Sequence, residues 1–368
     1  MRTEIIHTWP AFSALEGEWN GLLRQSRADS IFLTWEWIQA WREVVGQRFK
    51  PFAVAVRDGS NRLIGVAPFY RAQYRFLGTI PYRVLRVMGD YPTGAEYGDW
   101  IVHARREAEV ARCIGAALQA HRSDWDCIWM PNMAGWTGAR ERTASVAMDA
   151  GFSCRLRPKE FGYMRLPKAL DGYERCLSGD RRQQIRRLRR KVLSQDGAAV
   201  SCCAALEELP KYLQALFDLH FRRWHMKGQE GSFRRKPDEA RFYERFAPLA
   251  LKAGWLQIFA LKQHDAIRAV QLGYVYKSTF HQMQEGFDPD FLPGAGNVLR
   301  HHIIEACILQ GVEAYDFLGE MSEHKRRWLA TPREGCDAFI AHQSNKNRLL
   351  GLGVWPTGKY FRPSGAKR

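Results

Sequence analysis

The order of predicted helices and strands is the feature that most constrains the fold, because the same plan occurs twice along the 368 residues. In the first half, Thr34 opens a helical pattern over Trp35–Trp41, and Asp58-Gly59 joins two strand patterns as a hairpin turn. The predicted elements after this helix are strands at 51–57, 62–70 and 97–102, a helix at 105–120, a strand at 126–130 and a short helix ending near Gly151.

The second half repeats this order. A helix at 211–226 has apolar residues at helical spacing, and a second helix is predicted from Asp238 to Gly254, with Pro248 expected to kink or shorten it. The remaining predicted elements are strands at 255–262, 267–276 and 279–285, a helix at 297–310 and a strand at 313–318. Tight polar turns separate these three strands from one another, which favours antiparallel pairing.

Antiparallel strands followed by a helical crossover predict an α+β class. Each half is then a mixed, mostly antiparallel sheet flanked by helices. We expect an N-terminal domain at 1–165, a basic helical junction at 166–197, a C-terminal domain at 198–344 and a loosely held basic tail at 345–368.

The composition limits where the protein can work and which kinds of molecule it can bind. No apolar run approaches the ~20 residues of a membrane helix, and the first residues lack the apolar core of a secretory signal. The eight Cys form no CxxC pair, so we expect reduced thiols, no metal site and a cytoplasmic location. A net charge of +16 favours phosphates, nucleic acid, acidic glycans or an anionic membrane surface, unless the arginines only coat a solvated surface.

The most informative segment is "EGFDPDFLPGAGNVL", residues 285–299. A predicted strand leads through glycines into a helix, whose free N–H groups and dipole form an anion site suited to the pyrophosphate of coenzyme A. Such a loop is also an ordinary turn in many proteins. The predicted cofactor-binding residues are Pro293, Gly294, Ala295, Gly296, Asn297 and Val298. The equivalent helix in the first half follows His103-Ala104-Arg105 without glycine, which suggests a degenerate copy.

Acyl transfer to an amine requires a proton acceptor and stabilisation of the developing oxyanion. Glu285 stands at a predicted strand end beside the loop and is the candidate general base, with Tyr276 as a second group that could face a thioester. Asp316 ends the strand 313–318, and Lys325 follows in a basic, aromatic segment. These two residues are candidates for orienting an acceptor, or they form an ion pair with each other.

Two further segments carry polar groups. His220, Arg223 and Trp224 could line an acceptor pocket, although His220 in an apolar stripe is also typical of a core histidine. The run "DRRQQIRRLRRKVL", residues 180–193, has an apolar seam and seven cations. It is a solvated face at the domain junction, a contact for nucleic acid such as tRNA, or a contact for anionic lipid.

Four segments, in their order along the chain, resemble the CelD/BioF-like acetyltransferase family. They are "RRQQIRRLRRK", "LHFRRWHMKG", "EGFDPDFLPGAGNVLRHHIIEA" and "GVEAYDFLGEMSEHKRRW". This family is a branch of the GNAT acetyltransferase superfamily related to the Fem peptidyltransferases. The N-terminal "IFLTWEWIQAW" and "YGDWIV" extend the resemblance over nearly the whole chain. The family positions that match are Pro293, Gly294, Leu299, Asp316, Phe317, Gly319, Lys325 and Trp328.

The resemblance implies tandem GNAT-like folds and transfer of an acyl group from acetyl-CoA or another acyl-CoA. Phe291–Gly296 departs from the Gln/Arg-x-x-Gly-x-Gly/Ala pattern of ordinary GNAT enzymes, because its leading polar residue is absent. The first hypothesis is an N-acyltransferase acting on an amino sugar or an envelope or exopolysaccharide precursor, beside polysaccharide-biosynthesis proteins. The alternatives are a Fem-like transferase that uses aminoacyl-tRNA, and a non-catalytic scaffold that binds an anionic polymer.

Overall fold

The computed structural model describes residues 1–76, 79–226, 228–349 and 361–363. The chain divides into two compact units, and each is made of more than one segment of sequence. The first unit contains Met1–Tyr91, Ala95–Glu160 and Glu334–Arg368. The second contains Pro92–Gly94 and Phe161–Arg333.

The first unit is a sheet with strand order β1-β2-β3-β4-β6-β13, covered by helices. Its helices are α1 (Trp9–Ser13), α2 (Glu16–Arg24), α3 (Trp35–Val44), α4 (Glu107–Ala120), α5 (Ala139–Asp149) and α13 (Asn345–Leu349). Its strands are β1 (Arg2–Ile6), β2 (Lys50–Arg57), β3 (Leu63–Phe76), β4 (Ile80–Val87), β5 (Ile101–Val102), β6 (Cys127–Ala134) and β14 (Phe361–Pro363), with the later part of β13 (Thr331–Ala341).

The second unit has the strand order β7-β12-β11-β10-β9-β8. Its helices are α6 (Leu170–Cys176), α7 (Gly179–Leu193), α8 (Leu209–His225), α9 (Ser232–Arg235), α10 (Pro237–Lys252), α11 (Ala295–Leu309) and α12 (Glu323–Arg326). Its strands are the end of β7 (Ser153–Arg165), β8 (Ala198–Cys202), β9 (Leu256–Gln263), β10 (Ala266–Tyr276), β11 (Thr279–Phe287) and β12 (Ala314–Glu320).

The two units repeat one topology, although the third strand of the first unit is β4 and not the predicted strand at 97–102. Three antiparallel strands are followed by a helix and then by a strand parallel to the third: β2-β3-β4, α4 and β6 in the first unit, and β9-β10-β11, α11 and β12 in the second. Each unit adds one antiparallel strand from the other half of the sequence. Phe161–Arg165 of β7 pairs with β12, and Gly335–Ala341 of β13 pairs with β6.

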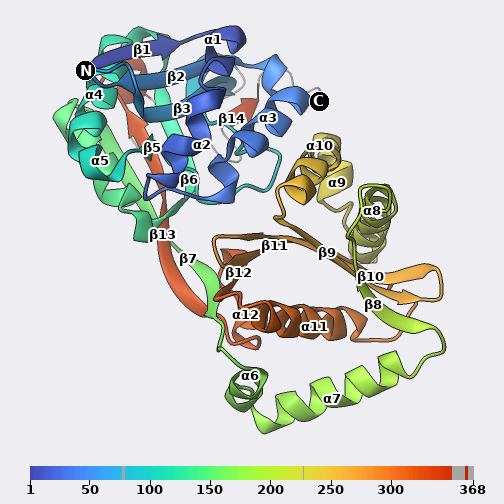
Figure 1. Cartoon of the computed structure of the whole chain (residues 1–368). Coiled ribbons are helices and arrows are strands. Elements are labelled where there is room, and N and C mark those ends of the chain that lie inside the picture. Colours follow the sequence, from blue (N-terminus) through green and yellow to red (C-terminus); the bar gives the residue numbers. More distant parts are fainter. Residues whose placement is uncertain (77–78, 227, 350–360, 364–368) are drawn as a thin grey trace. The chain divides into compact units, whose positions relative to one another are not determined.

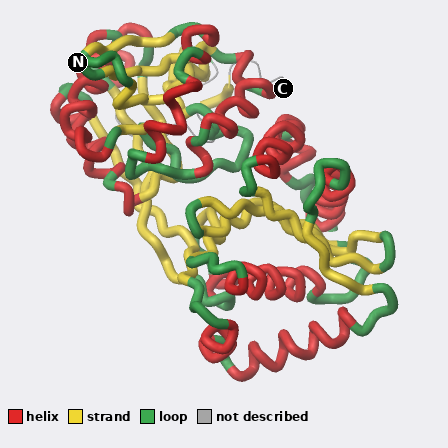
Figure 2. The backbone as a smooth tube through the Cα atoms, viewed as in Figure 1, coloured by secondary structure: helices red, strands yellow, loops and turns green. Residues whose placement is uncertain are grey.

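In the second unit, helices cover both faces of the sheet (Figures 1 and 2). Helix α11 lies on one face with α7 outside it, and α8 and α10 lie on the other. Ile303 and Ile304 of α11, Ile185 and Val192 of α7, and Trp328 are all buried in one apolar cluster. Helix α7 is thus part of the second unit's core through its apolar seam.

Several predicted elements differ from the structure. Helix α10 runs through Pro248 to Lys252, because Phe246, Ala247 and Ala250 are buried on both sides of the proline. The strands β1, β4, β7, β8 and β13 have no counterpart in the prediction.

The described part of the tail contacts the first unit. Asn347 of α13 is buried, accepts a hydrogen bond from Tyr82 Oη at 2.6 Å and donates one to the Asp126 carbonyl at 2.9 Å. Strand β14 pairs with β3. The prediction for the rest of the tail falls on residues 350–360 and 364–368, which lie outside the described residues.

The packing of α11 gives a stability test. Ile303→Ala removes a side chain with no exposed surface and should lower the free energy of unfolding by about 2–5 kcal/mol. Leu309→Ala, at a side chain 74% exposed on the same helix, should change it by less than about 0.5 kcal/mol. Urea unfolding followed by circular dichroism measures both. Equal effects of the two variants would contradict the placement of α11 against the sheet.

Candidate active site at the start of helix α11

The sheet of the second unit opens into a fork between β11 and β12. These parallel strands pair only at Thr279–His281 with Ala314–Asp316, although β11 continues to Phe287 and β12 to Glu320. On β12, Leu318 and Gly319 have φ angles of +50° and +57°, so the strand turns away at this point. The side chains of the diverging ends can therefore face a ligand instead of a neighbouring strand.

Two predicted catalytic residues hold this turn in place. Asp316 Oδ1 accepts a hydrogen bond from the Leu318 N–H at 2.9 Å. Lys325 Nζ donates to the carbonyl oxygens of Leu318, Gly319 at 3.0 Å and Glu320 at 2.7 Å. Since an ammonium group has three protons to donate, these three contacts use its full capacity. Asp316 and Lys325 thus shape the end of β12.

Glu285, on β11, lies between two arginines from different helices. Its Oε1 accepts a hydrogen bond from Arg223 Nη1 of α8 at 2.8 Å, and its Oε2 is paired with Arg300 Nη2 of α11. Burial alone would raise the pKa of Glu285, but Arg300 and Arg223 outweigh it and lower the pKa to about 2. A carboxylate with this pKa is a weak proton acceptor at neutral pH, which disfavours the predicted role of general base.

Behind this cluster, a chain of hydrogen bonds crosses the sheet. Gln271 Nε2 donates to Tyr315 Oη at 2.7 Å, and Tyr315 Oη donates to Gln282 Oε1 at 2.8 Å. Gln282 Nε2 in turn donates to Glu285 Oε2 at 3.4 Å. Burial raises the pKa of the Tyr315 hydroxyl, so this hydroxyl stays protonated. The hydrogen bonds therefore keep their direction, from Gln271 to Glu285.

Helix α11 begins beside these charges. Gly294 precedes its first residue with a φ of +89°, a conformation that favours glycine. Gly296 and Asn297 stand in the first turn. The Asn297 N–H donates to the Gly294 carbonyl at 2.9 Å, whereas no backbone acceptor within the described residues takes the Gly296 N–H. Glu285, Gly294, Gly296, Asn297 and Arg300 all line one cavity of about 260 Å³, which we call the inner cavity. Its other lining residues are Arg223, Val270, Gln271, Gly286, Phe287, Leu299 and His324.

The predicted cofactor-binding residues divide into three groups. Gly294, Gly296 and Asn297 line the inner cavity. Ala295 and Val298 are buried in the apolar cluster instead, on the side of the helix that faces the sheet. Pro293 is exposed. This division follows helical periodicity, because only one side of the first turn can face the cavity.

The predicted acceptor residues are not all brought together. Arg223 lines the inner cavity. Trp224 Nε1 donates to His220 Nε2 at 2.9 Å, and burial lowers the pKa of His220 to about 4, so this imidazole is neutral. Tyr276 lies at the hairpin end of β10, against Trp255. It is five residues along the strand from Gln271, or about 16 Å, and does not line the cavity.

Arg300, Gln271 and His324 were not predicted as site residues, although they line the inner cavity. Arg300 is only 4% exposed, and its Nη1 donates to His324 Nε2 at 2.7 Å. One signal in the sequence marks it: Arg300 follows Gly296 by four residues, which places both on one side of a helix. Gln271 and His324 come from other elements and carry no local signal.

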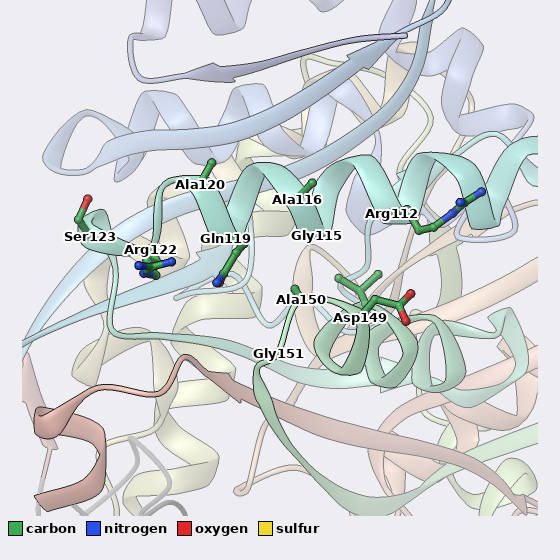
Figure 3. A pocket seen from close by; sticks show the side chains of 11 residues that line it. Arg112, Gly115, Ala116, Gln119, Ala120, Arg122, Ser123, Asp149, Ala150 and Gly151 are labelled. Carbon is green, nitrogen blue, oxygen red and sulfur yellow. The ribbon is translucent and has the colours of Figure 1, made fainter.

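The hollows found in the first unit are lined by other kinds of residue. One hollow, of about 1030 Å³, lies between the C-terminal parts of α4 and α5, where Arg112, Gln119, Arg122 and Asp149 surround small residues such as Gly115 (Figure 3). The helix ends beside it are C-termini, which carry partial negative charge, so this hollow lacks the helix N-terminus that favours a phosphate. Near the end of β4, the buried Arg86 Nε donates to Asp90 Oδ2 at 2.7 Å.

Comparison with known proteins identifies the second unit. Residues 179–326, from α7 to α12, match the family model described as the acetyltransferase (GNAT) domain. This segment is a GNAT-type acyltransferase domain. The match favours an enzyme over the non-catalytic scaffold considered above, and a GNAT domain implies an acyl-CoA co-substrate. It begins at α7, so the basic helix belongs to the GNAT segment.

Solved structures share the fold over nearly the whole chain. FemX is similar with a TM-score of 0.63 and 12% identity, over 95% of this chain and 99% of FemX. The C-terminal domain of a putative lysylphosphatidylglycerol synthetase from Agrobacterium fabrum has a TM-score of 0.54 and 13% identity, over 92% and 94% of the two chains. A conserved protein from Bacteroides thetaiotaomicron has a TM-score of 0.51 and 11% identity, over 93% and 100%. No curated protein matches the chain.

These findings confirm the α+β class and the tandem GNAT-like folds. The narrower assignment to the CelD/BioF-like branch stays a prediction, as do the domain limits and the site residues. Within the described residues, no helix is long and apolar enough to span a bilayer, and no cluster of His, Cys, Asp or Glu is arranged to hold a metal ion.

The Glu285 cluster predicts a dependence of stability on pH. Because the pKa of Glu285 is lower in the folded chain than its ordinary value of 4.5, its contribution is present above pH 4.5 and is lost as the pH falls toward 2. Glu285→Gln should lower the unfolding free energy at pH 7 by about 3 kcal/mol, since it leaves two arginines without a carboxylate.

Urea unfolding at several pH values measures this contribution. The difference between the wild-type chain and Glu285→Gln should shrink between pH 4.5 and pH 2. Glu244→Gln, at an exposed carboxylate of α10, is the control and should give no such difference. A constant gap between wild type and Glu285→Gln over this range would contradict the low pKa.

Proposed function

We propose that the chain is an acyl-CoA-dependent N-acyltransferase whose donor site is the inner cavity at the start of α11. The observation that carries the proposal is the excess of positive charge there. Two arginines, Arg223 and Arg300, meet one carboxylate, and the positive end of a fifteen-residue helix adjoins them. A buried excess of cations is favourable when an anion neutralises it.

The residues present fit the diphosphate of coenzyme A. The Gly296 N–H, which no backbone acceptor within the described residues takes, can donate to a phosphate oxygen, and the absence of a side chain there lets the phosphate approach the main chain. Arg300 Nε makes no hydrogen bond within the described part of the chain, so a buried donor is left for a ligand. When bound, the thioester of acyl-CoA supplies the activated acyl group.

In this proposal, Glu285 is a positioning residue. It holds Arg223 and Arg300 at the cavity, while its low pKa keeps it ionised. The Gln271–Tyr315–Gln282 chain fixes the far side of the same carboxylate. Asp316 and Lys325 keep the fork open by holding the turn of β12. The first unit, which has no glycine loop at the start of α4, is the degenerate copy.

We propose an amino sugar or another amine-bearing envelope or exopolysaccharide precursor as the acceptor. The support is the resemblance of the motifs to the CelD/BioF-like family, whose members often accompany such pathways. An acceptor of this type is a small molecule or a glycan precursor, consistent with a cavity formed by one unit.

Helix α7 supports a second candidate, a donor carried on RNA. Arg186 and Arg189 are paired with Glu174 and Glu305. Within the described part of the chain, the other five α7 cations, Arg181, Arg182, Arg187, Arg190 and Lys191, make no ion pair. An exposed row of cations of this kind suits a phosphate backbone. An aminoacyl-tRNA would then replace acyl-CoA as the donor.

Ligand-induced stabilisation separates the two donors. Acetyl-CoA at about 100 times its Kd should add about 2.7 kcal/mol to the stability of the folded chain, measured as a rise in melting temperature. Gly296→Val should abolish this rise, because the added side chain would enter the inner cavity while its nearest neighbour, Phe287 Cδ1, leaves room for a Cβ at 3.4 Å.

Gly17→Val is the matched control, since it makes the same change at the second residue of α2 in open space. This variant should keep the full response to acetyl-CoA. A rise in melting temperature with aminoacyl-tRNA but none with acetyl-CoA would overturn the first candidate in favour of the second.

A further inference from the structure

A second cavity, of about 630 Å³, adjoins the inner cavity, and we call it the outer cavity. The two share Asn297 and His324 among their lining residues. The outer cavity is formed where α7 begins, beside α11 and α12. Its other lining residues are Ser178, Asp180, Arg181, Gln184 and Arg327. Its volume is within the range of cavities that hold a whole small-molecule group.

Arg181 is fixed in place at this cavity. Its guanidinium lies over the ring of Trp328, 4.4 Å from the centroid, and its Nη1 donates to Gln184 Oε1 at 2.7 Å. Its Nε is covered and makes no hydrogen bond within the described residues. A stacked, partly bonded guanidinium with a donor to spare is well suited to a phosphate group.

The cations at the two cavities lie close enough to repel one another. Burial lowers the pKa of Arg181, and the charges of Arg300 and Arg327 lower it further. The pKa of His324 is likewise lowered by burial and by Arg300, Arg223 and Arg181, against the opposite effect of Glu285. Positive charge from both cavities therefore converges on His324, and an anion would relieve the repulsion.

The outer cavity has less negative charge than positive charge. Asp180 is exposed in the first turn of α7, where a carboxylate stabilises the helix dipole. Glu323 approaches Arg327 at 3.8 Å, but both side chains are largely exposed, so this pair holds Arg327 only weakly. Arg181 and Arg327 remain available to an incoming anion.

We propose that the outer cavity binds the 3′-phosphate of the adenosine end of coenzyme A, with Arg181 and Arg327 as the contacting cations. This inference rests on the proposed donor site. A diphosphate held at Gly296 and Asn297 continues past Asn297 into the outer cavity, where the nucleoside and its phosphomonoester lie. A phosphomonoester carries close to two negative charges at neutral pH, which matches two arginines.

The proposal predicts discrimination between coenzyme A and 3′-dephospho-coenzyme A. Isothermal titration calorimetry on the full chain should give a Kd for coenzyme A at least about tenfold lower, since a charge-assisted hydrogen bond contributes about 1.5–3 kcal/mol. Arg327→Gln and Arg181→Gln should each reduce the ratio of the two Kd values, because each weakens the binding of coenzyme A and not that of the dephospho form. Asp180→Asn should increase it, because it removes the one carboxylate that lines the cavity.

Arg187→Gln is the matched control, an exposed cation of the same helix that lines neither cavity, and it should leave the ratio unchanged. Should Arg181→Gln unfold the chain by exposing Trp328, the exposed Arg327 still provides the test. An NMR titration of His324 adds a second readout: coenzyme A should raise its pKa more than the dephospho form does.

Equal affinity of the wild-type chain for the two ligands would overturn the inference while leaving the donor site intact. Discrimination that survives in both arginine variants would also overturn it. Binding of neither ligand would instead refute the proposed donor, and this inference with it.

Discussion

The contact of Glu285 with Arg223 and Arg300 joins the parts from which the site is built. It connects β11 to α8 on one face of the sheet and to α11 on the other. Removing a carboxylate and two guanidinium groups from water costs several kcal/mol per ion, and a single carboxylate cannot balance two cations. The cluster is therefore electrostatically incomplete in the absence of an anion, and that incompleteness is the main reason to place a phosphate-bearing donor beside it.

The geometry around this cluster depends on the fork in the sheet. Paired strands would use their backbone groups on each other, whereas β11 and β12 separate after three pairs. The separation is held by the left-handed turn at Leu318-Gly319, by Asp316 and by Lys325. Residues that look catalytic in the sequence thus have a structural reason for being polar, and the open ends of the strands carry the groups that face the cavity.

The sequence predicted those features that depend on local patterns. The hairpins of β9–β11, the helix α11 and its glycine-rich start follow from periodicity and turn residues within a few positions. The strands β7 and β13 were missed because their partners, β12 and β6, are far away in the sequence. The surroundings of Glu285 could not be predicted for a similar reason. Its pKa is set by Arg223, 62 residues earlier, and by Arg300, 15 residues later.

The most direct measurement of the central claim is a crystal structure of the full chain with coenzyme A. We expect the diphosphate at the start of α11, in contact with the backbone N–H group of Gly296 and with Arg300. Coenzyme A bound to the first unit, or bound in the second unit away from α11, would contradict the assignment of the donor site.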